Sequence, residues 1–238
     1  MTKNWIIKEQ GNEADVKHLQ EALGVVKPIA NILVQRGIKT YDQARAFFRP
    51  SLDDLHDPFL MKDMEKAVDR IEQAIDNQEG LLIYGDYDVD GTTAVSLVYS
   101  YFSQFLKHTE YYIPDRYKEG YGISKKGIDY AADNGHRLII ALDCGIKAVD
   151  KIEYARTKGV EFIICDHHTP DDTIPDAVAV LDAKRKDCSY PYDELSGCGV
   201  GFKLIQAFQQ KRGGDFNELI PYLDLVAISI ASDIVPIT

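Results

Sequence analysis

The stretch LLIYGDYDVDG, residues 81–91, decides the fold. Its first four residues are apolar without alternation, which is the pattern of a strand buried on both faces of a parallel sheet. Three aspartates, Asp86, Asp88 and Asp90, follow at once, and the helical pattern of residues 92–106 comes directly after them. The stretch therefore predicts a strand that ends in an acidic turn and leads into a helix.

The same alternation of short apolar runs and amphipathic helices continues along the chain. Four further runs indicate strands: residues 111–114, 138–142, 162–165 and 177–181. Helical patterns lie between some of them, at residues 125–134 and 147–158. Together these segments predict a doubly wound α/β domain around a mainly parallel sheet. Because ligands in such folds bind beyond the carboxyl ends of the strands, we expect the functional residues there.

The N-terminal segment has a different pattern. Its apolar residues fall at helical spacing in three stretches, residues 14–23, 28–35 and 41–48, which glycines and prolines separate. We therefore expect a small helical segment over residues 1–62, followed by a catalytic domain over residues 63–238 that opens with a helix. A last helix is expected over residues 216–233. Because the sequence stops abruptly soon afterwards, we expect that further C-terminal domains are absent from this chain.

Composition narrows the class of protein. The 238 residues are 45% apolar and 27% charged, as in a folded globular chain rather than a disordered one. The formal net charge of −11 argues against non-specific coating of nucleic acid, which depends on Lys and Arg. The apolar stretches are too short to cross a bilayer and the first residues lack a secretory signal, so we expect a cytoplasmic protein without a membrane partner. Four cysteines without a Cys-x-x-Cys pair predict reduced, mostly buried thiols.

The acidic turn of residues 85–91 predicts a metal site. Alternate residues of an extended segment point the same way, so Asp86, Asp88 and Asp90 would repel one another unless a divalent cation lay between them. A calcium-binding loop opens with the same Asp-x-Asp-x-Asp-Gly pattern, but it needs a Glu where this chain has Leu97. A phosphate-binding loop is excluded as well, because Gly-Lys-Ser/Thr does not follow.

Two more polar groups follow predicted strands. Asp143 comes after residues 138–142, and the triplet Asp166-His167-His168 comes after residues 162–165. Strand ends of a parallel sheet converge on one edge, so these groups should join the acidic turn in a mixed carboxylate and imidazole site suited to Mn²⁺ or Mg²⁺. Asp233 lies in an apolar stretch where an unpaired carboxylate would be costly, and metal binding would remove that cost.

These residues carry a resemblance to the DHH phosphoesterase superfamily, which is named after the Asp-His-His triplet. The sequence resembles those members that degrade single-stranded DNA, and the likeness runs from the helical entry segment to the last residue. Its motifs come in order: residues 56–60, 85–91, 113–116, 119–122, 142–146, 166–168, 197–204 and 231–236. Val89 and Gly201 stand where the family usually has Ala, and neither change removes a candidate ligand.

The resemblance implies a site with two manganese or magnesium ions. Its ligands would be Asp88, Asp90, Asp143, His167 and Asp233, with Asp86 and His168 completing the site or contacting phosphate. The implied reaction is phosphodiester hydrolysis, above all 5′ to 3′ digestion of single-stranded DNA in repair and recombination. Two cations would activate a water molecule for in-line attack, so no side-chain nucleophile is required. Protein partners in repair or replication, and the oligomeric state, stay open.

Two side chains are candidates for binding phosphate, each with a simpler alternative. Arg116 could clamp a phosphate with paired hydrogen bonds, or it could form a surface ion pair with Glu119. His168 could donate to a phosphate oxygen, or it could support a metal ligand from behind. The glycine-rich residues 197–201 would allow close packing before a helix that starts near Phe202.

Two other functions fit the same motifs. A relative acting on short oligonucleotides, cyclic dinucleotides or pyrophosphate would use the same metal ligands. The arginine-bearing residues 116–122 and the glycine-rich residues 197–204 favour the nuclease over such an enzyme. A replication scaffold without activity would have lost metal ligands, whereas here every candidate ligand is present.

Overall fold

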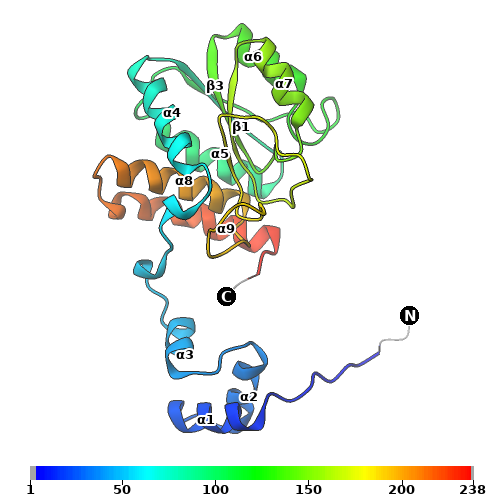
Figure 1. Ribbon diagram of the computed structural model, residues 1–238, viewed down its shortest axis with the longest axis vertical. Coiled ribbons are helices and arrows are strands. Elements are labelled where there is room, and N and C mark those ends of the chain that lie inside the picture. The colour runs from blue at the N-terminus through cyan, green and yellow to red at the C-terminus, as the bar shows by residue number, and fades with distance from the viewer. Residues whose placement is uncertain (1–3, 237–238) are drawn as a thin grey trace. The chain divides into compact units, whose positions relative to one another are not determined.

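The computed structural model describes residues 4–236, and its helices and strands are drawn in Figure 1. The chain divides into two compact units, the first ending at Leu55 and the second beginning at His56. The first unit holds three helices and a short 3₁₀ turn: α1 (Glu13–Leu23), α2 (Lys27–Gln35), α3 (Tyr41–Phe48) and η1 (Leu52–Asp54). Leu19, Ala30 and Leu33 pack in its small core.

Local sequence explains where these first helices begin and end. The Asn12 side chain accepts hydrogen bonds from the first free N–H groups of α1, and Gly24 ends that helix in a left-handed conformation. Thr40 and Gln43 form a capping box at the start of α3. The helical character that the sequence predicts for this segment therefore rests on ordinary capping signals.

The second unit is built on a parallel sheet. The strands are β1 (Gly80–Gly85), β2 (Thr109–Tyr112), β3 (His136–Leu142), β4 (Glu161–Cys165) and β5 (Ala179–Leu181). They lie in the order β2-β1-β3-β4-β5, and each neighbouring pair is parallel. Every residue of β1 is buried, as its unbroken apolar pattern predicts.

Helices cover both faces of the sheet, which confirms the predicted doubly wound α/β fold (Figure 1). One face is covered by α4 (Met64–Asp76), α5 (Val89–Phe102) and α8 (Gly197–Lys211), the other by α6 (Lys125–Asp133) and α7 (Val149–Thr157). Side chains alternate along β1, so that Leu81 and Ile83 enter the first core while Leu82 and Tyr84 enter the second.

Three predicted helices have clearly different bounds in the structure. The helix expected over residues 92–106 is α5, which begins at Val89 and ends at Phe102. The last one, expected over residues 216–233, is split into the 3₁₀ turn η3 (Phe216–Tyr222) and the helix α9 (Leu223–Asp233). Pro221 lies inside η3, and a proline there has no N–H to continue α-helical hydrogen bonding. The helix expected near Phe202 starts earlier, because Ser196 caps it by accepting a hydrogen bond from the N–H of Gly199.

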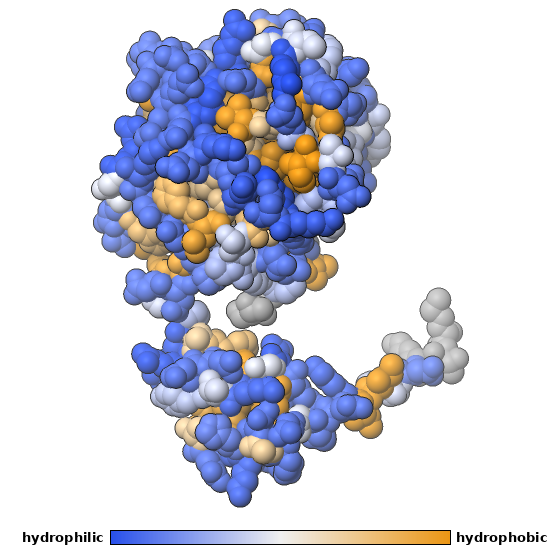
Figure 2. Space-filling view, viewed as in Figure 1, coloured by the Kyte–Doolittle hydropathy of each residue, from blue (hydrophilic) through white to orange (hydrophobic). Residues whose placement is uncertain are grey.

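The surface of the second unit agrees with its composition. The face in view in Figure 2 is mostly hydrophilic, with hydrophobic side chains in separate patches. All four cysteines are free, and Cys144, Cys165 and Cys198 are buried. Among residues 4–236, the helices are all too short or too polar to cross a membrane.

Candidate metal centre

Four of the five strands are followed immediately by an aspartate. These residues are Asp86 after β1, Asp143 after β3, Asp166 after β4 and Asp182 after β5. None is more than 2% exposed. Because parallel strands end at the same edge of the sheet, this edge collects buried negative charge that requires cations or hydrogen-bond donors nearby.

His167 lies at the centre of the first group of side chains. Its Nε2 atom is 3.1 Å from Asp143 Oδ1, 3.6 Å from Asp90 Oδ2 and 3.6 Å from Asp233 Oδ2. Asp233 is the last residue of α9, so the C-terminal helix brings its carboxylate to the sheet edge. Three carboxylates around one imidazole nitrogen make a candidate cation site.

A second group adjoins the first. Asp86, Asp88 and Asp143 have carboxylate oxygens that all lie within 4.8 Å of one another. Asp143 belongs to both groups, and its backbone is left-handed with φ 57°. An aspartate adopts this conformation more readily than most residues. Asp143 is therefore placed to share its carboxylate between two cations.

The acidic turn is not extended throughout, so the expectation that its three carboxylates face one way is wrong. Asp88 is the N-cap of α5 and accepts a hydrogen bond from the N–H of Gly91 at 2.9 Å. Asp90 already lies in the first helical turn and faces the His167 group rather than the Asp86 group. Gly91 is required here, because a Cβ at this position would collide with the backbone of Asp86.

Asp90 is also bound to the start of α8. Its two oxygens accept hydrogen bonds from the N–H groups of Gly197 and Cys198, at 2.6 and 2.8 Å. The Ser229 hydroxyl of α9 donates a third, at 2.7 Å. A helix N-terminus favours a nearby negative charge, so the Asp90 carboxylate is stabilised and fixed in place by the protein itself.

The buried polar atoms of the centre fit divalent cations. Among the described residues, Asp86 Oδ1, Asp143 Oδ1 and both ring nitrogens of His167 have no hydrogen-bond partner. Such buried atoms are costly unless they gain one. Neighbouring ligands of a Mg²⁺- or Mn²⁺-sized ion lie about 3 Å apart, since each metal–oxygen bond is about 2.1 Å long. The 3.1 Å approach of His167 Nε2 to Asp143 Oδ1 matches that spacing.

The raised pKa values of two aspartates also favour a cation at this centre. Burial raises the pKa of Asp143 to about 7, the Asp90 carboxylate adds to this rise, and His167 opposes it. Burial also raises the pKa of Asp86, with Asp88 adding to the effect. Carboxylates that resist ionisation in this way are stabilised when a cation enters.

His168 is held differently from His167. Asp166 Oδ1 lies 2.7 Å from His168 Nδ1 and also accepts the backbone N–H of His167. Chiefly because of this bond to Asp166, the pKa of His168 rises to about 9, which favours the cationic form of its ring. Its Nε2 atom lies 3.2 Å from the Tyr121 hydroxyl, beside a hollow that Lys147 and Thr169 help to line. His168 is thus placed as a donor to an anion.

Arg116 lies beside the acidic turn and not in an ion pair with Glu119. The Glu119 carboxylate instead accepts hydrogen bonds from the hydroxyls of Tyr112 and Ser124, at 2.9 and 2.6 Å. The Arg116 guanidinium carbon is 5.2 Å from the centre of the Tyr87 ring. This cation–π contact leaves the donors of an exposed guanidinium free for phosphate.

Asp182 was not predicted from the sequence as a site residue. This fully buried residue forms no ion pair within the described part of the chain, and its Oδ2 atom has no hydrogen-bond partner there. Burial raises the pKa of Asp182 to about 7. The Asp166 carboxylate adds to this rise, and His167 opposes it. The position of Asp182 directly after residues 177–181 was the available signal, since the same criterion selected Asp143.

The glycines that open α8 serve the centre by their size. A Cβ at Gly197 would lie 2.6 Å from Asp143 Cβ, closer than real side chains approach. The glycine-rich residues therefore pack closely, as expected, but they do so inside the helix rather than before it.

Comparison with known proteins identifies a matching family and several similar proteins. Residues 80–230 match the model of the DHH family, N-terminal domain. The single-stranded-DNA-specific exonuclease RecJ of Bacillus subtilis (strain 168) is 40% identical over 229 residues, which cover 96% of this chain and 28% of the relative. The Escherichia coli (strain K12) RecJ is 35% identical over 184 residues, 73% of this chain and 32% of the relative.

Solved structures agree with these relatives. The chain resembles an exonuclease RecJ bound to manganese, at 28% identity and a TM-score of 0.67, over 74% of this chain and 44% of the other. It also resembles RecJ in complex with Mn²⁺ from Thermus thermophilus, at 25% identity and a TM-score of 0.76, over 94% of this chain and 31% of the other. The chain spans about a third of the length of the curated relatives named here.

Proposed function

The chain belongs to the DHH family, and from this premise we propose that it is the metal-dependent hydrolytic part of an exonuclease acting on single-stranded DNA. One observation carries the proposal above all. His167 and Asp143 meet at the sheet edge with buried ligand atoms that have no hydrogen-bond partner among residues 4–236, and Asp143 belongs to two adjoining groups of candidate ligands. That arrangement suits a pair of cations on one phosphodiester.

The ligand assignment follows the two groups. Asp90, Asp143, His167 and Asp233 would hold one ion, and Asp86, Asp88 and Asp143 the other. Mn²⁺ is the first choice, with Mg²⁺ second, because carboxylate and imidazole suit both and related RecJ structures contain them. When bound, the ions supply an activated water and offset charge on the scissile phosphate and its leaving oxygen.

The side chains around the ions bind and orient the substrate. His168, kept protonated by Asp166, donates from Nε2 to a non-bridging phosphate oxygen in place of its contact with Tyr121. Arg116 binds a neighbouring phosphate of the strand through paired hydrogen bonds, and the ring of Tyr87 holds the guanidinium plane. A strand bound at both points would be aligned for attack at one bond.

The alternatives are weaker. A substrate as small as a dinucleotide would not need an exposed arginine on the loop that follows β2, whereas a strand would. A scaffold without activity would not need the complete ligand set. We include in the proposal digestion from 5′ to 3′, a role in DNA repair and recombination, and a cytoplasmic location, which are the properties that membership among such nucleases implies.

The test is Mn²⁺-dependent release of nucleotides from a 5′-phosphorylated single strand. Asp143→Asn keeps the shape and the left-handed backbone but removes the shared charge, so Mn²⁺ binding and hydrolysis should both be lost while the circular dichroism spectrum is unchanged. Asp172→Asn, on the exposed surface, is the matched control. Undiminished hydrolysis in Asp143→Asn would refute the centre. Faster hydrolysis of a dinucleotide than of the strand would instead favour the short-substrate alternative.

A further inference from the structure

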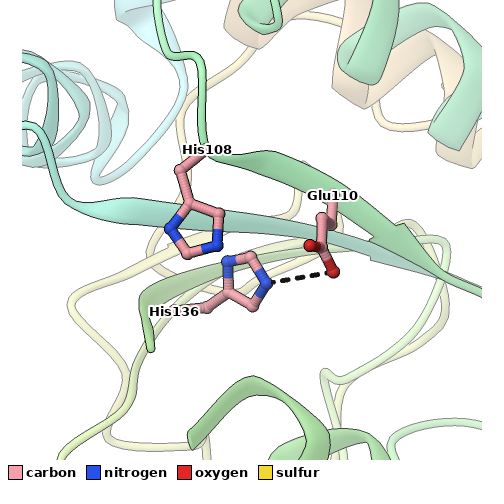
Figure 3. Close-up of side chains that lie close together, drawn as sticks. All are labelled: His108, Glu110 and His136. Atoms are coloured by element: carbon pink, nitrogen blue, oxygen red, sulfur yellow. Dashed lines mark ion pairs between the residues drawn. The ribbon is translucent and has the colours of Figure 1, made fainter. Parts of the chain in front are cut away.

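A second cluster of side chains that can bind a metal lies at the amino ends of the strands. It consists of His108, just before β2, Glu110 on β2, and His136 at the start of β3 (Figure 3). Each offers one ligand atom, and these atoms lie within 4.8 Å of one another. The candidate metal centre occupies the carboxyl ends of the strands, so this cluster at their amino ends is a separate site.

The sheet explains how the three side chains meet. His108 and Glu110 are two residues apart, so they share one face of β2. Between β2 and β3 runs β1, whose Gly80 pairs with His136 and stands one residue before the pair Leu81–Thr109. A Cβ at Gly80 would lie 2.8 Å from His108 Nδ1 and 3.0 Å from His136 Nδ1. The bare glycine therefore lets the two rings approach across β1, to 4.5 Å between centres.

The environment of His136 indicates that a ligand binds here. His136 is completely buried, and neither of its ring nitrogens has a hydrogen-bond partner in the described part of the chain. Its Nε2 atom lies 3.3 Å from Glu110 Oε2 without the alignment of a hydrogen bond.

The other members of the cluster complete a site. The Tyr130 hydroxyl donates to Glu110 Oε2 at 2.6 Å and so orients the carboxylate, as residues behind metal ligands commonly do. His108 is exposed and gives an ion access from solvent. Two imidazoles and one carboxylate form the donor set of zinc sites that keep a fourth position for water, whereas Mg²⁺ prefers oxygen ligands alone.

We propose that His108, Glu110 and His136 bind a zinc ion that ties the edge strand β2 to β3 across β1. The ion would give both nitrogen-bearing rings a partner and would fix the amino end of β2. The carboxyl end of the same strand leads to the loop that carries Arg116, so the ion would also steady that loop.

The test measures zinc bound per chain after dialysis against a zinc-buffered solution. Wild type, His108→Gln, Glu110→Gln and the control His18→Gln are compared; His18 is an exposed histidine on α1. Zinc taken up at the metal centre is common to all four proteins and cancels. We expect one ion fewer in His108→Gln and Glu110→Gln than in wild type and His18→Gln. Equal zinc in all four proteins would overturn the proposal.

A second readout keeps folding separate from binding. Zinc should raise the melting temperature of wild type more than that of His108→Gln, with both proteins saturated with Mn²⁺. Since His108 is exposed, its replacement should leave the melting temperature without zinc unchanged. An equal zinc effect on the two proteins would contradict the proposal even if their dialysis results differed.

Discussion

Asp90 accepts a hydrogen bond from the backbone N–H of Gly197 at 2.6 Å, across 107 residues of sequence. The contact joins the acidic turn after β1 to the first turn of α8. Asp90 therefore differs from the other candidate ligands, because hydrogen bonds within the protein already compensate its charge, whereas Asp143 and Asp86 have a buried oxygen without a partner in the described part of the chain.

The hydrogen bonds of Asp90 predict that it stabilises the metal-free protein more than Asp88 does. Asp90→Ala leaves the N–H groups of Gly197 and Cys198 buried without an acceptor, so the free energy of unfolding should fall by about 2–4 kcal/mol. Asp88→Ala loses only the cap of α5, worth about 1 kcal/mol. Urea denaturation with a chelator measures both values. Equal losses in the two variants would contradict the anchoring role of Asp90.

Asp166 is expected to act through His168. Asp166→Asn should lower kcat by about 10- to 100-fold, as when residues behind an active side chain are changed, while Mn²⁺ affinity changes little. His168→Gln should have a similar effect, and the double variant should be no worse than either single one. If the fold-loss of kcat in the double variant were the product of the two single losses, Asp166 would act independently of His168.

Arg116 should contribute to substrate affinity and not to the chemical step. Arg116→Ala is predicted to raise KM for a single strand with kcat nearly unchanged, because its phosphate contact exists in the ground state as well. Arg116→Lys should restore little, since an ammonium cannot form the paired contact. The slope of log KM against log salt should also become shallower. Arg156→Ala, which breaks a surface pair with Asp176, is the control.

Lys203 makes stability depend on pH. Burial lowers its pKa from 10.5 to about 8, with Asp57 opposing, and its Nζ donates to the carbonyl of His56. Between these two pKa values the unfolded chain holds the proton and the folded chain does not, so the free energy of unfolding rises with pH. The full effect is on the order of 3 kcal/mol.

Comparison with Lys203→Met isolates that effect. The stability of wild type relative to the variant should increase from about pH 8 to about pH 10.5 and stay flat below about pH 8. Denaturation curves at several pH values measure it. A difference that does not change over this range would mean that Lys203 keeps its proton in the folded state.

The sequence predicted the architecture well because burial of the sheet on both faces leaves a clear pattern. The apolar run of residues 81–84 and the helical spacing after it required a parallel strand and its covering helix. The start of α8 was missed for a physical reason: glycines are poor helix formers, yet Gly197 is needed because Asp143 leaves no room for a side chain.

The site was predicted less completely than the fold. Strand ends located Asp86, Asp143 and His167, because their position follows from the sheet alone. The direction of Asp90 could not be predicted, since it depends on hydrogen bonds to α8 and α9, which are distant in sequence. Whether each side chain binds an ion or substrate stays a prediction that the experiments above address.

The position of Asp233 at the end of α9 has a consequence for biosynthesis. A chain emerging from the ribosome presents the acidic turn early, but the carboxylate of Asp233 arrives only after almost all of the α/β unit has been made. The hydrogen bond from Ser229 to Asp90 arrives with the same helix. Under the proposed ligand assignment, a shorter nascent chain lacks one of the four ligands of the first ion, so tight binding of that ion requires α9 to have been made.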